Sequence, residues 1–314
     1  MQHAQLKTVY AQKKGDLYKM LYADRVIEYT GFKQINILKE EGKMDGQLKV
    51  AAVQVTVEQN NIKKNMENVE KMAMTVAENE KNVDLILFHE ACLESGVQLP
   101  EFDKKLSDEI HDFWKSIAKK VGTNVLAGRL ERKEDGIYNK ATVYAPDGRI
   151  LADYAKIHLF NSERETLIPG KELVMFELNG IKIGIMICAD FGFPELSRAY
   201  AVNGCHMLAV TSSWAYPDDD LWTICNQARS SENGVYCVSV DRIGPAGNGC
   251  IKVGRSMVCN PDGLIIANLW EKTDTYYVQT IYREEVEKRH QTMKWLEWLR
   301  PDLYTDWLKT YKWD

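Results

Sequence analysis

Three side chains that could do chemistry stand where apolar segments of the sequence end or are interrupted. Glu90 closes the segment DLILFHE (84–90), Lys156 lies inside YAKIHLF (154–160), and Cys188 closes IKIGIMIC (181–188). A buried carboxylate or ammonium group is costly unless it is paired. A thiol becomes a strong nucleophile only with a base or a positive charge beside it. Brought together, the three would form a cysteine nucleophile, a general base and a cation that stabilises negative charge.

Each of the three residues also has a purely structural explanation. A cysteine at the end of a strand is most often an inert core residue. A glutamate there can cap a helix or pair with a neighbouring charge, and a lysine usually extends its ammonium group to the surface. Position alone therefore does not select catalysis.

The segment around Cys188 favours a reactive setting. The Ile-rich run 181–187 predicts a strand, and Phe-Gly-Phe-Pro-Glu (191–195) then opens a helix, with Pro194 suited to its first turn and Glu195 to its dipole. Enzymes with α/β folds bind their ligands at the carboxyl ends of strands. A nearby helix N-terminus would also lower the pKa of the thiol.

Alternating strand and helix patterns must position these residues. Buried strands are predicted at 48–55, 84–90 and 125–128. Between them, apolar residues recur with helical spacing at Ile62, Met66, Val69, Ala73 and Val76, and again at Leu106, Ile110, Phe113, Ile117 and Val121. Pro-Asp-Gly at 146–148 and 261–263 predicts two hairpin turns. The order indicates a layered α/β fold, preceded by a polar N-terminal extension, residues 1–46, and continuing as one domain over 47–314.

Composition excludes several classes of function. A net charge of −5 and a pI near 5.8 lack the basic footprint of a nucleic-acid-binding protein. No apolar run approaches the roughly 20 residues needed to span a bilayer, and the first 20 residues lack the apolar core of a secretory signal. Seven cysteines without a CxxC pair, and without zinc-ligand spacing to the six histidines, indicate reduced thiols and no metal site. We therefore expect a cytoplasmic protein that binds neither nucleic acid nor membranes.

Six ordered motifs resemble those of the nitrilase, or carbon–nitrogen hydrolase, superfamily, over roughly residues 48–308. The glutamate motif is matched by LILFHEACLESGV and the YxKxHLF motif by 154–160. The GxxIC-x-D-x-x-FPE motif is matched by Gly184, Ile187, Cys188, Asp190, Phe193, Pro194 and Glu195. RSSEN (229–233), GRSMVCNPDG (254–263) and RPDLY (300–304) resemble the remaining three.

The resemblance implies a fold, an assembly and a mechanism. The fold is a four-layer α-β-β-α sandwich that pairs into homodimers through the helices after the nucleophile and through the C-terminal segment, where Trp295, Trp298, Leu299 and Trp307 would pack. Cys188 would form a thioester with the substrate, with Glu90 as general base. Lys156 and the backbone N–H of Ala189 would stabilise the oxyanion. No metal or organic cofactor is needed.

The resemblance also implies a second carboxylate that positions the substrate, upstream of a Pro-Gly. NSERETLIPG (161–170) offers Glu163 and Glu165, and we select Glu163 because its six-residue offset from Pro169 fits most branches of the family. Either glutamate could instead pair only with Arg164 or Lys171, a surface contact that contributes little.

The residues after Cys188 bear on the substrate. Nitrilases of the family usually follow the nucleophile with Trp-Glu, whereas this chain has Ala189-Asp190, which favours an amide. Phe191 and Gly192 stand where carbamoylases of D-amino acids place arginines, so a bidentate carboxylate clamp is absent there. An uncharged or amine-bearing amide, or a carbamoyl amine, is the expected substrate class.

Residues further along the chain are open to two explanations. Trp214 is a candidate pocket wall or an ordinary core tryptophan. The acidic run Asp218, Asp219 and Asp220 could attract a cationic substrate or simply cap a helix. Asp241 stands where the family more often has asparagine, and the sequence offers no physical reason for the change.

The leading hypothesis is thus an amidase or carbamoyl-amide hydrolase that releases ammonia. Acyl transfer to another acceptor, or nitrile hydrolysis, would use the same thioester. A scaffold without catalytic activity is the third alternative, and it is disfavoured because an idle buried charge cluster destabilises a fold.

Overall fold

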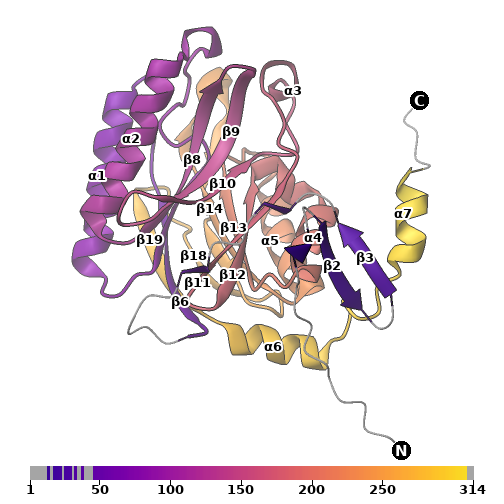
Figure 1. Ribbon diagram of the computed structural model, residues 1–314. Coiled ribbons are helices and arrows are strands. Elements are labelled where there is room, and N and C mark those ends of the chain that lie inside the picture. The colour runs from indigo at the N-terminus through magenta and orange to yellow at the C-terminus, as the bar shows by residue number, and fades with distance from the viewer. Residues whose placement is uncertain are drawn as a thin grey trace, which may run out of the picture.

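The computed structural model describes residues 45–309, apart from the side chains at 248, 307 and 309, and before them the backbone of a few short strands. Two large sheets run through this part of the chain (Figure 1). One has six strands in the order β10-β9-β8-β7-β6-β19. The other has eight, in the order β18-β17-β14-β13-β12-β11-β4, with β5 also paired to β11.

The first sheet is built from the predicted strand–helix alternation. Strands β6 (Gln47–Gln54), β7 (Leu85–Phe88) and the start of β8 (Asn124–Lys133) are parallel neighbours, and helices α1 (Ile62–Asn79) and α2 (Lys104–Val121) connect them. The Asn61 and Asp103 side chains cap the two helices by accepting backbone N–H groups of the first turn. The remaining strands are antiparallel: β9 (Gly136–Tyr144), β10 (Ile150–Ala155) and β19 (Thr275–Tyr282).

The second sheet carries the cysteine segment at its centre. Strands β12 (Ile181–Ile187), β13 (Met207–Ser212) and β14 (Tyr236–Asp241) are parallel, joined by helices α4 (Pro194–Val202) and α5 (Asp219–Asn233). Antiparallel strands flank them: β11 (Leu173–Leu178), β17 (Met257–Cys259) and β18 (Ile265–Asn268). Both predicted Pro-Asp-Gly hairpins are confirmed, as β9–β10 and β17–β18.

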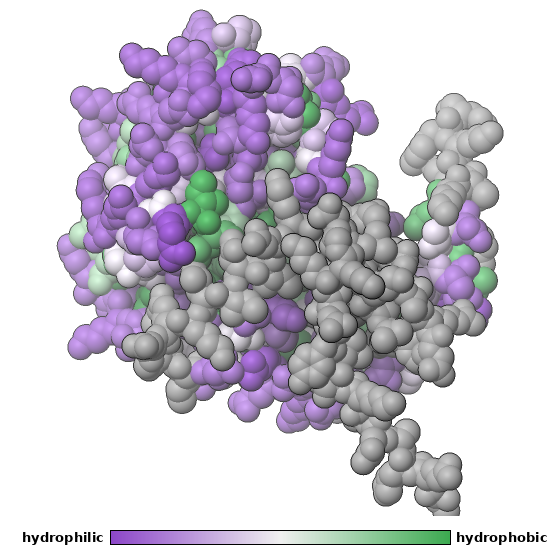
Figure 2. Space-filling view, viewed as in Figure 1, coloured by the Kyte–Doolittle hydropathy of each residue, from purple (hydrophilic) through white to green (hydrophobic). Residues whose placement is uncertain are grey.

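The four layers are confirmed. One core lies between the two sheets and beneath α4 and α5, and a second joins the first sheet to α1 and α2. Helices α1 and α2 form one outer layer and α4 and α5 the other (Figure 1). On the face shown in Figure 2, the surface over α1, α2 and the β8–β9 hairpin is mainly hydrophilic, as expected for an outer layer. No helix in the described ranges is long and apolar enough to cross a membrane.

Smaller elements complete the chain. Strands β1 (Lys13–Lys14), β2 (Leu17–Tyr22) and β3 (Arg25–Tyr29) form a separate sheet, whereas β4 (Phe32–Lys33) and β5 (Ile37–Leu38) add to the edge of the second sheet through β11. The backbone of the predicted extension therefore contributes to the main sheet. The other short elements are β15 (Ile243–Pro245), β16 (Ile251–Val253), α3 (Glu163–Thr166), α6 (Arg283–Thr292) and α7 (Pro301–Lys309).

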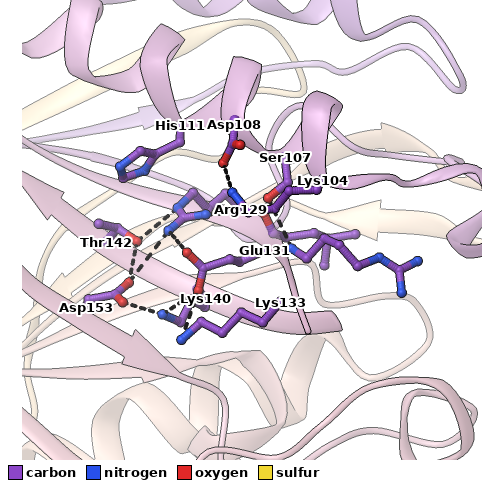
Figure 3. Close-up of polar contacts among 12 residues, drawn as sticks. Lys104, Ser107, Asp108, His111, Arg129, Glu131, Lys133, Lys140, Thr142 and Asp153 are labelled. Atoms are coloured by element: carbon purple, nitrogen blue, oxygen red, sulfur yellow. Dashed lines mark hydrogen bonds and ion pairs between the residues drawn. The ribbon is translucent and has the colours of Figure 1, made fainter. Parts of the chain in front are cut away.

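A charged cluster on the outer face of the first sheet links β8, β9 and β10 (Figure 3). Glu131 accepts from the almost fully buried Arg129 at 3.0 Å and from Lys140 at 2.8 Å, and Asp153 also contacts Lys140. Burial alone would raise the pKa of Glu131, but the charges of Arg129 and Lys140 outweigh it and lower that pKa to about 2. The cluster therefore stabilises the fold only while Glu131 is ionised.

This cluster predicts an acid-dependent loss of stability. Because the pKa of Glu131 is lower in the folded than in the unfolded chain, its contribution is complete above the unfolded value of 4.5 and is lost as pH falls toward 2. After allowance for solvent screening, we expect the ionised Glu131 to add about 1–2 kcal/mol to the free energy of unfolding. Denaturant unfolding between pH 5.5 and 2.5 should show a smaller decline for Glu131→Gln than for wild type. The exposed Glu134→Gln is the control, and an unchanged decline in Glu131→Gln would contradict the assignment.

Candidate active site

The structure brings Glu90 and Lys156 together, although 66 positions separate them in the chain. Glu90 follows β7 at the strand's carboxyl end, and Lys156 follows β10. The Lys156 Nζ donates to Glu90 Oε1 at 2.7 Å, and both side chains are buried. The ammonium group thus lies inside the protein rather than at the surface, which removes the ordinary explanation for a lysine in an apolar segment.

The second carboxylate next to Lys156 is Glu163. Its Oε2 accepts from Lys156 Nζ at 2.8 Å and from the Phe160 backbone N–H at 2.7 Å. Glu165 lies two positions on in the same short helix and is exposed. The sequence left both glutamates open, and the structure places only Glu163 at the cluster.

Asn139 joins the two carboxylates and was not singled out from the sequence. It projects from β9, is 2% exposed, and its Nδ2 donates to Glu90 Oε1 at 2.7 Å and to Glu163 Oε1 at 3.1 Å. Its backbone carbonyl also accepts from the Lys156 backbone N–H at 2.9 Å. In the sequence, Asn139 is only a polar residue within a predicted strand. Many strands contain such a residue, so the sequence does not distinguish it as a site residue.

Cys188 begins the short 3₁₀ turn Cys188–Gly192, directly after β12. Its φ is +45°, in the left-handed region that non-glycine residues rarely adopt. A strained residue at the end of a buried strand is a feature of functional turns. The side chain is partly exposed and lies within hydrogen-bonding reach of Glu90. The predicted strand-to-turn setting is therefore present.

Electrostatics in the cluster hold the three groups in a defined resting state. Burial and the Glu90 charge raise the pKa of the Cys188 thiol to about 12, although Lys156 opposes them. The lowered thiol pKa expected from the nearby helix N-terminus is therefore wrong, because burial outweighs it. Burial would also raise the pKa of Glu90, but the charge and hydrogen bond of Lys156, with hydrogen bonds from Asn139 and Cys188, lower it overall. Burial would lower the pKa of Lys156, but Glu90, Cys188 and Glu163 raise it. The resting site holds a neutral thiol, a carboxylate and an ammonium ion.

Asp190 ties the cysteine turn to the lysine segment. It is fully buried and accepts from the Tyr154 hydroxyl at 2.7 Å, the Ile187 backbone N–H at 3.0 Å and the His158 backbone N–H at 2.8 Å. The His158 ring also contacts Asp190 at 2.9 Å and stacks on Phe193, with centroids 3.7 Å apart. These contacts give the motif residues around Cys188 and Lys156 a positioning role.

Arg229 supports the turn from the other side. Its Nε donates to the Phe191 carbonyl at 3.1 Å and its Nη2 to the Gly192 carbonyl at 3.3 Å. Phe191 is fully buried in the core and Gly192 is exposed. Neither offers a charged group for a substrate carboxylate, as the sequence indicated.

The remaining predicted residues lie at the ends of neighbouring strands. Ala189 follows Cys188 and is partly exposed. Trp214 follows β13 and is partly buried, and its ring packs on Trp222 with centroids 5.6 Å apart. In the acidic run, Asp218 is at the N-cap of α5 but makes no side-chain capping bond, Asp219 pairs with Arg255 at 2.9 Å, and Asp220 is almost fully exposed. The run is therefore a mainly solvated surface rather than a side-chain cap.

All seven cysteines are free, and five of them are buried. Over residues 45–309, no three His, Cys, Asp or Glu side chains are grouped closely enough to hold a metal ion.

Known proteins share both the sequence pattern and the fold. Residues 49–291 match the family model described as carbon-nitrogen hydrolase. A probable nitrilase of Schizosaccharomyces pombe is 29% identical over 267 residues, covering 81% of this chain and 96% of its own length. The 2-oxoglutaramate amidase of Bacillus subtilis is 28% identical, covering 76% of this chain and 93% of its own. An omega-amidase of Danio rerio is 30% identical, covering 61% of this chain and 73% of its own length.

Solved structures agree on the architecture. The amidase from Nesterenkonia sp. AN1, in a complex with acrylamide, superposes with a TM-score of 0.75 at 21% identity, covering 86% of this chain and 99% of that one. A carbon-nitrogen hydrolase from Helicobacter pylori G27 superposes with a TM-score of 0.77 at 21% identity, covering 84% and 99%.

Proposed function

The chain belongs to the carbon–nitrogen hydrolase family, and we propose that it hydrolyses the C–N bond of a small amide through a thioester on Cys188. The observation that carries the proposal is the position of Lys156, whose Nζ contacts both Glu90 and Glu163 while Glu90 reaches the thiol. Burying these charged groups at the ends of strands costs free energy of desolvation. A catalytic role explains why the chain buries them there.

In the first half-reaction Cys188 attacks the amide carbonyl carbon. The resting thiol is neutral because its pKa is raised to about 12, so its proton must pass to Glu90 as the S–C bond forms. The negative charge that develops on the carbonyl oxygen is stabilised by the Lys156 ammonium group and the Ala189 backbone N–H. Collapse of this intermediate breaks the C–N bond, and Glu90 returns the proton so that ammonia leaves.

In the second half-reaction water hydrolyses the thioester. Glu90, again a carboxylate, takes a proton from the water as its oxygen attacks the thioester carbonyl. The same oxyanion donors stabilise the second tetrahedral intermediate. Its collapse breaks the C–S bond and releases the carboxylic acid, and Glu90 returns its proton to the sulfur, which restores the thiol and the carboxylate. Covalent catalysis thus divides one difficult step into two easier ones.

Glu163 has a measurable share in this chemistry. Because it orients the Lys156 ammonium group together with Asn139, we expect Glu163→Gln to lower kcat/KM by about 10- to 100-fold. The exposed Glu165→Gln is a matched control in the same helix and should stay within about twofold of wild type. Steady-state ammonia release measures both variants. A larger loss in Glu165→Gln would transfer the role to that residue.

We infer a short amide as the substrate. Relatives named omega-amidase and 2-oxoglutaramate amidase support an amide, and the absence of a charged clamp at Phe191 and Gly192 favours uncharged or amine-bearing forms. A screen of aliphatic amides, ω-amides of dicarboxylic acids, carbamoyl amines and nitriles, with ammonia as readout, tests this inference. Turnover of nitriles alone would contradict it, and hydroxamate formation with added hydroxylamine at the expense of acid would favour acyl transfer.

We also infer a cytoplasmic homodimer, built on a catalytic domain of residues 47–314 with 1–46 as an extension. Exposed apolar side chains near the C-terminus support the pairing: Trp298, Tyr304 and Leu308 are 65%, 43% and 60% exposed. A cavity of about 650 Å³ lies between α4 and this segment, and Figure 2 shows α7 carrying apolar side chains away from the main body. The side chain of Trp307 lies outside the described part.

If the chain forms a homodimer, sedimentation should give twice the chain mass of 36.0 kDa. A monomer would contradict the pairing.

A further inference from the structure

The cysteine turn, Ser212 and Asp241 stand at the same end of the three central strands. In the parallel register, Ile187 of β12 lies opposite Thr211 of β13, and Thr211 lies opposite Val240 of β14. The next positions are Cys188, Ser212 and Asp241, and Ser212 is paired with Asp241 in the same register. Paired residues of neighbouring strands share a face. Asp241 therefore lies two strands away from the nucleophile, with Ser212 between them.

The Asp241 carboxylate connects two separate loops. It is fully buried. Its Oδ1 accepts from the Trp214 backbone N–H at 2.6 Å, and its Oδ2 accepts from the Gly254 backbone N–H at 2.9 Å. Trp214 follows β13, whereas Gly254 follows β16, so one side chain fixes the course of both segments. An asparagine has a single acceptor oxygen and could hold only one of the two N–H groups.

The first of these segments passes beside the nucleophile. Ile187, which precedes Cys188, is paired with Thr211, which precedes Ser212, and the buried Ser212 hydroxyl oxygen makes no hydrogen bond to any described residue. The Ser213 backbone N–H lowers the pKa of Cys188. On the far side of the segment, Lys252 Nζ donates to the Ser213 carbonyl at 2.5 Å. The segment Ser212–Trp214 thus lies beside the cysteine turn, and Asp241 anchors it at the Trp214 backbone N–H.

We propose that Asp241 is a positioning residue for the chemistry at Cys188. By holding the Trp214 and Gly254 backbone N–H groups, its carboxylate keeps the segment Ser212–Trp214 in place beside the thiolate and its thioester. The inference rests on the proposed function, because it assigns a role within that same reaction. It also supplies a physical reason for aspartate at this position.

Ionisation of Asp241 offers a readout that a merely structural residue would lack. Burial raises the pKa of Asp241 to about 7, although the Trp214 N–H, Lys252 and the Gly254 N–H oppose the shift. The other charged group beside it is Arg242, the next residue in the chain. A protonated carboxyl group accepts two N–H donors poorly. The anchor is therefore complete above about pH 7 and weakens below it.

The test compares Asp241→Asn with wild type between pH 5.5 and 9. We expect kcat to fall about 10- to 100-fold at pH 8 with KM within about threefold, because a misplaced segment beside the thiolate affects the transition state rather than binding. The acidic limb near pH 7 in the wild-type kcat profile should be absent from the variant. Glu94→Gln is the matched control: Glu94 is another buried carboxyl group whose pKa burial raises to about 7, but it accepts from Leu93 and Leu130. This control should keep the wild-type limb.

A second readout needs no substrate. The rate of Cys188 alkylation by iodoacetamide, mapped by peptide mass spectrometry, should show the same limb in wild type and Glu94→Gln and lose it in Asp241→Asn. If no amide is turned over but alkylation behaves in this way, the proposed function fails while the positioning role stands. If the rate of Asp241→Asn still falls below about pH 7, the positioning role is overturned. The role is also overturned if the variant loses the same fraction of the rate at every pH and has a lower Tm. If Asp241→Asn does not fold, Asp241→Glu takes its place. We expect Asp241→Glu to react more slowly than wild type and to show the same fall in rate below about pH 7. If Asp241→Glu shows no such fall, the proposal is overturned.

Discussion

Replacing Cys188 with alanine is expected to abolish turnover, by about 10⁴-fold or more, while the fold is retained. The side chain is small and partly exposed and packs only at the edge of the core between the sheets, so its loss removes few contacts. The chemistry, in contrast, has no alternative nucleophile once the sulfur is removed, and covalent catalysis is lost with it. Ammonia release on the best substrate of the screen measures the first effect, and thermal unfolding the second.

Cys250 supplies the matched control for this experiment. It is the other free cysteine that is partly exposed, and Cys250→Ala should keep wild-type turnover. Alkylation of wild type by iodoacetamide should label Cys188 in step with loss of activity. Full activity in Cys188→Ala would end the assignment of the nucleophile, whatever the behaviour of the other thiols.

Replacing Lys156 with methionine is expected to damage both activity and stability. The loss of an oxyanion donor should lower kcat by about 10³-fold. The folded state should lose about 3–5 kcal/mol, because Glu90 becomes a buried carboxylate without its counter-charge. Since burial would then act on Glu90 with little opposition, its pKa should rise. The destabilisation should consequently be largest at high pH, where Glu90 stays ionised, and smaller toward pH 5.

A double variant separates the two effects of Lys156. In Lys156→Met with Glu90→Gln, the buried charge is gone, so much of the stability should return while the activity does not. Lys182→Met, at a partly exposed lysine in β12 of the second sheet, is the control and should change neither. Denaturant unfolding at pH 5 and pH 8, together with kcat, measures all three variants. Equal stability of Lys156→Met and wild type at pH 8 would show that the buried ion pair contributes nothing.

Local pattern was sufficient for the elements that carry these groups. The near-continuous apolar runs at 84–88 and 181–187 predicted buried strands, and both are present as β7 and β12. Pro-Asp-Gly placed both hairpins, and Pro194 stands in the first turn of α4 as expected. Such signals are readable because side-chain periodicity and turn chemistry act over a few residues.

Local sequence pattern does not predict contacts between residues that are far apart in the chain. Asn139 belongs to the cluster only because β9 lies in the same sheet as β7, two strands away and 49 positions along the chain from Glu90. The spacing to Pro169 favoured Glu163 over Glu165 without excluding Glu165, and the direction of one short helical turn decides that Glu163 meets Lys156. Such outcomes depend on register and chain direction, which sequence spacing does not specify.

By itself, the sequence determined that three costly groups, Glu90, Lys156 and Cys188, stand at the ends of buried segments, and it indicated the family and the chemistry that join them. The tertiary structure decided how they meet, with Lys156 between two carboxylates. It also brought the Trp214 and Gly254 backbone N–H groups, from two separate segments, to the one carboxylate of Asp241. The physical reason is that burial and pairing costs are local properties of a residue, whereas the partner that offsets them is chosen by strand order and register.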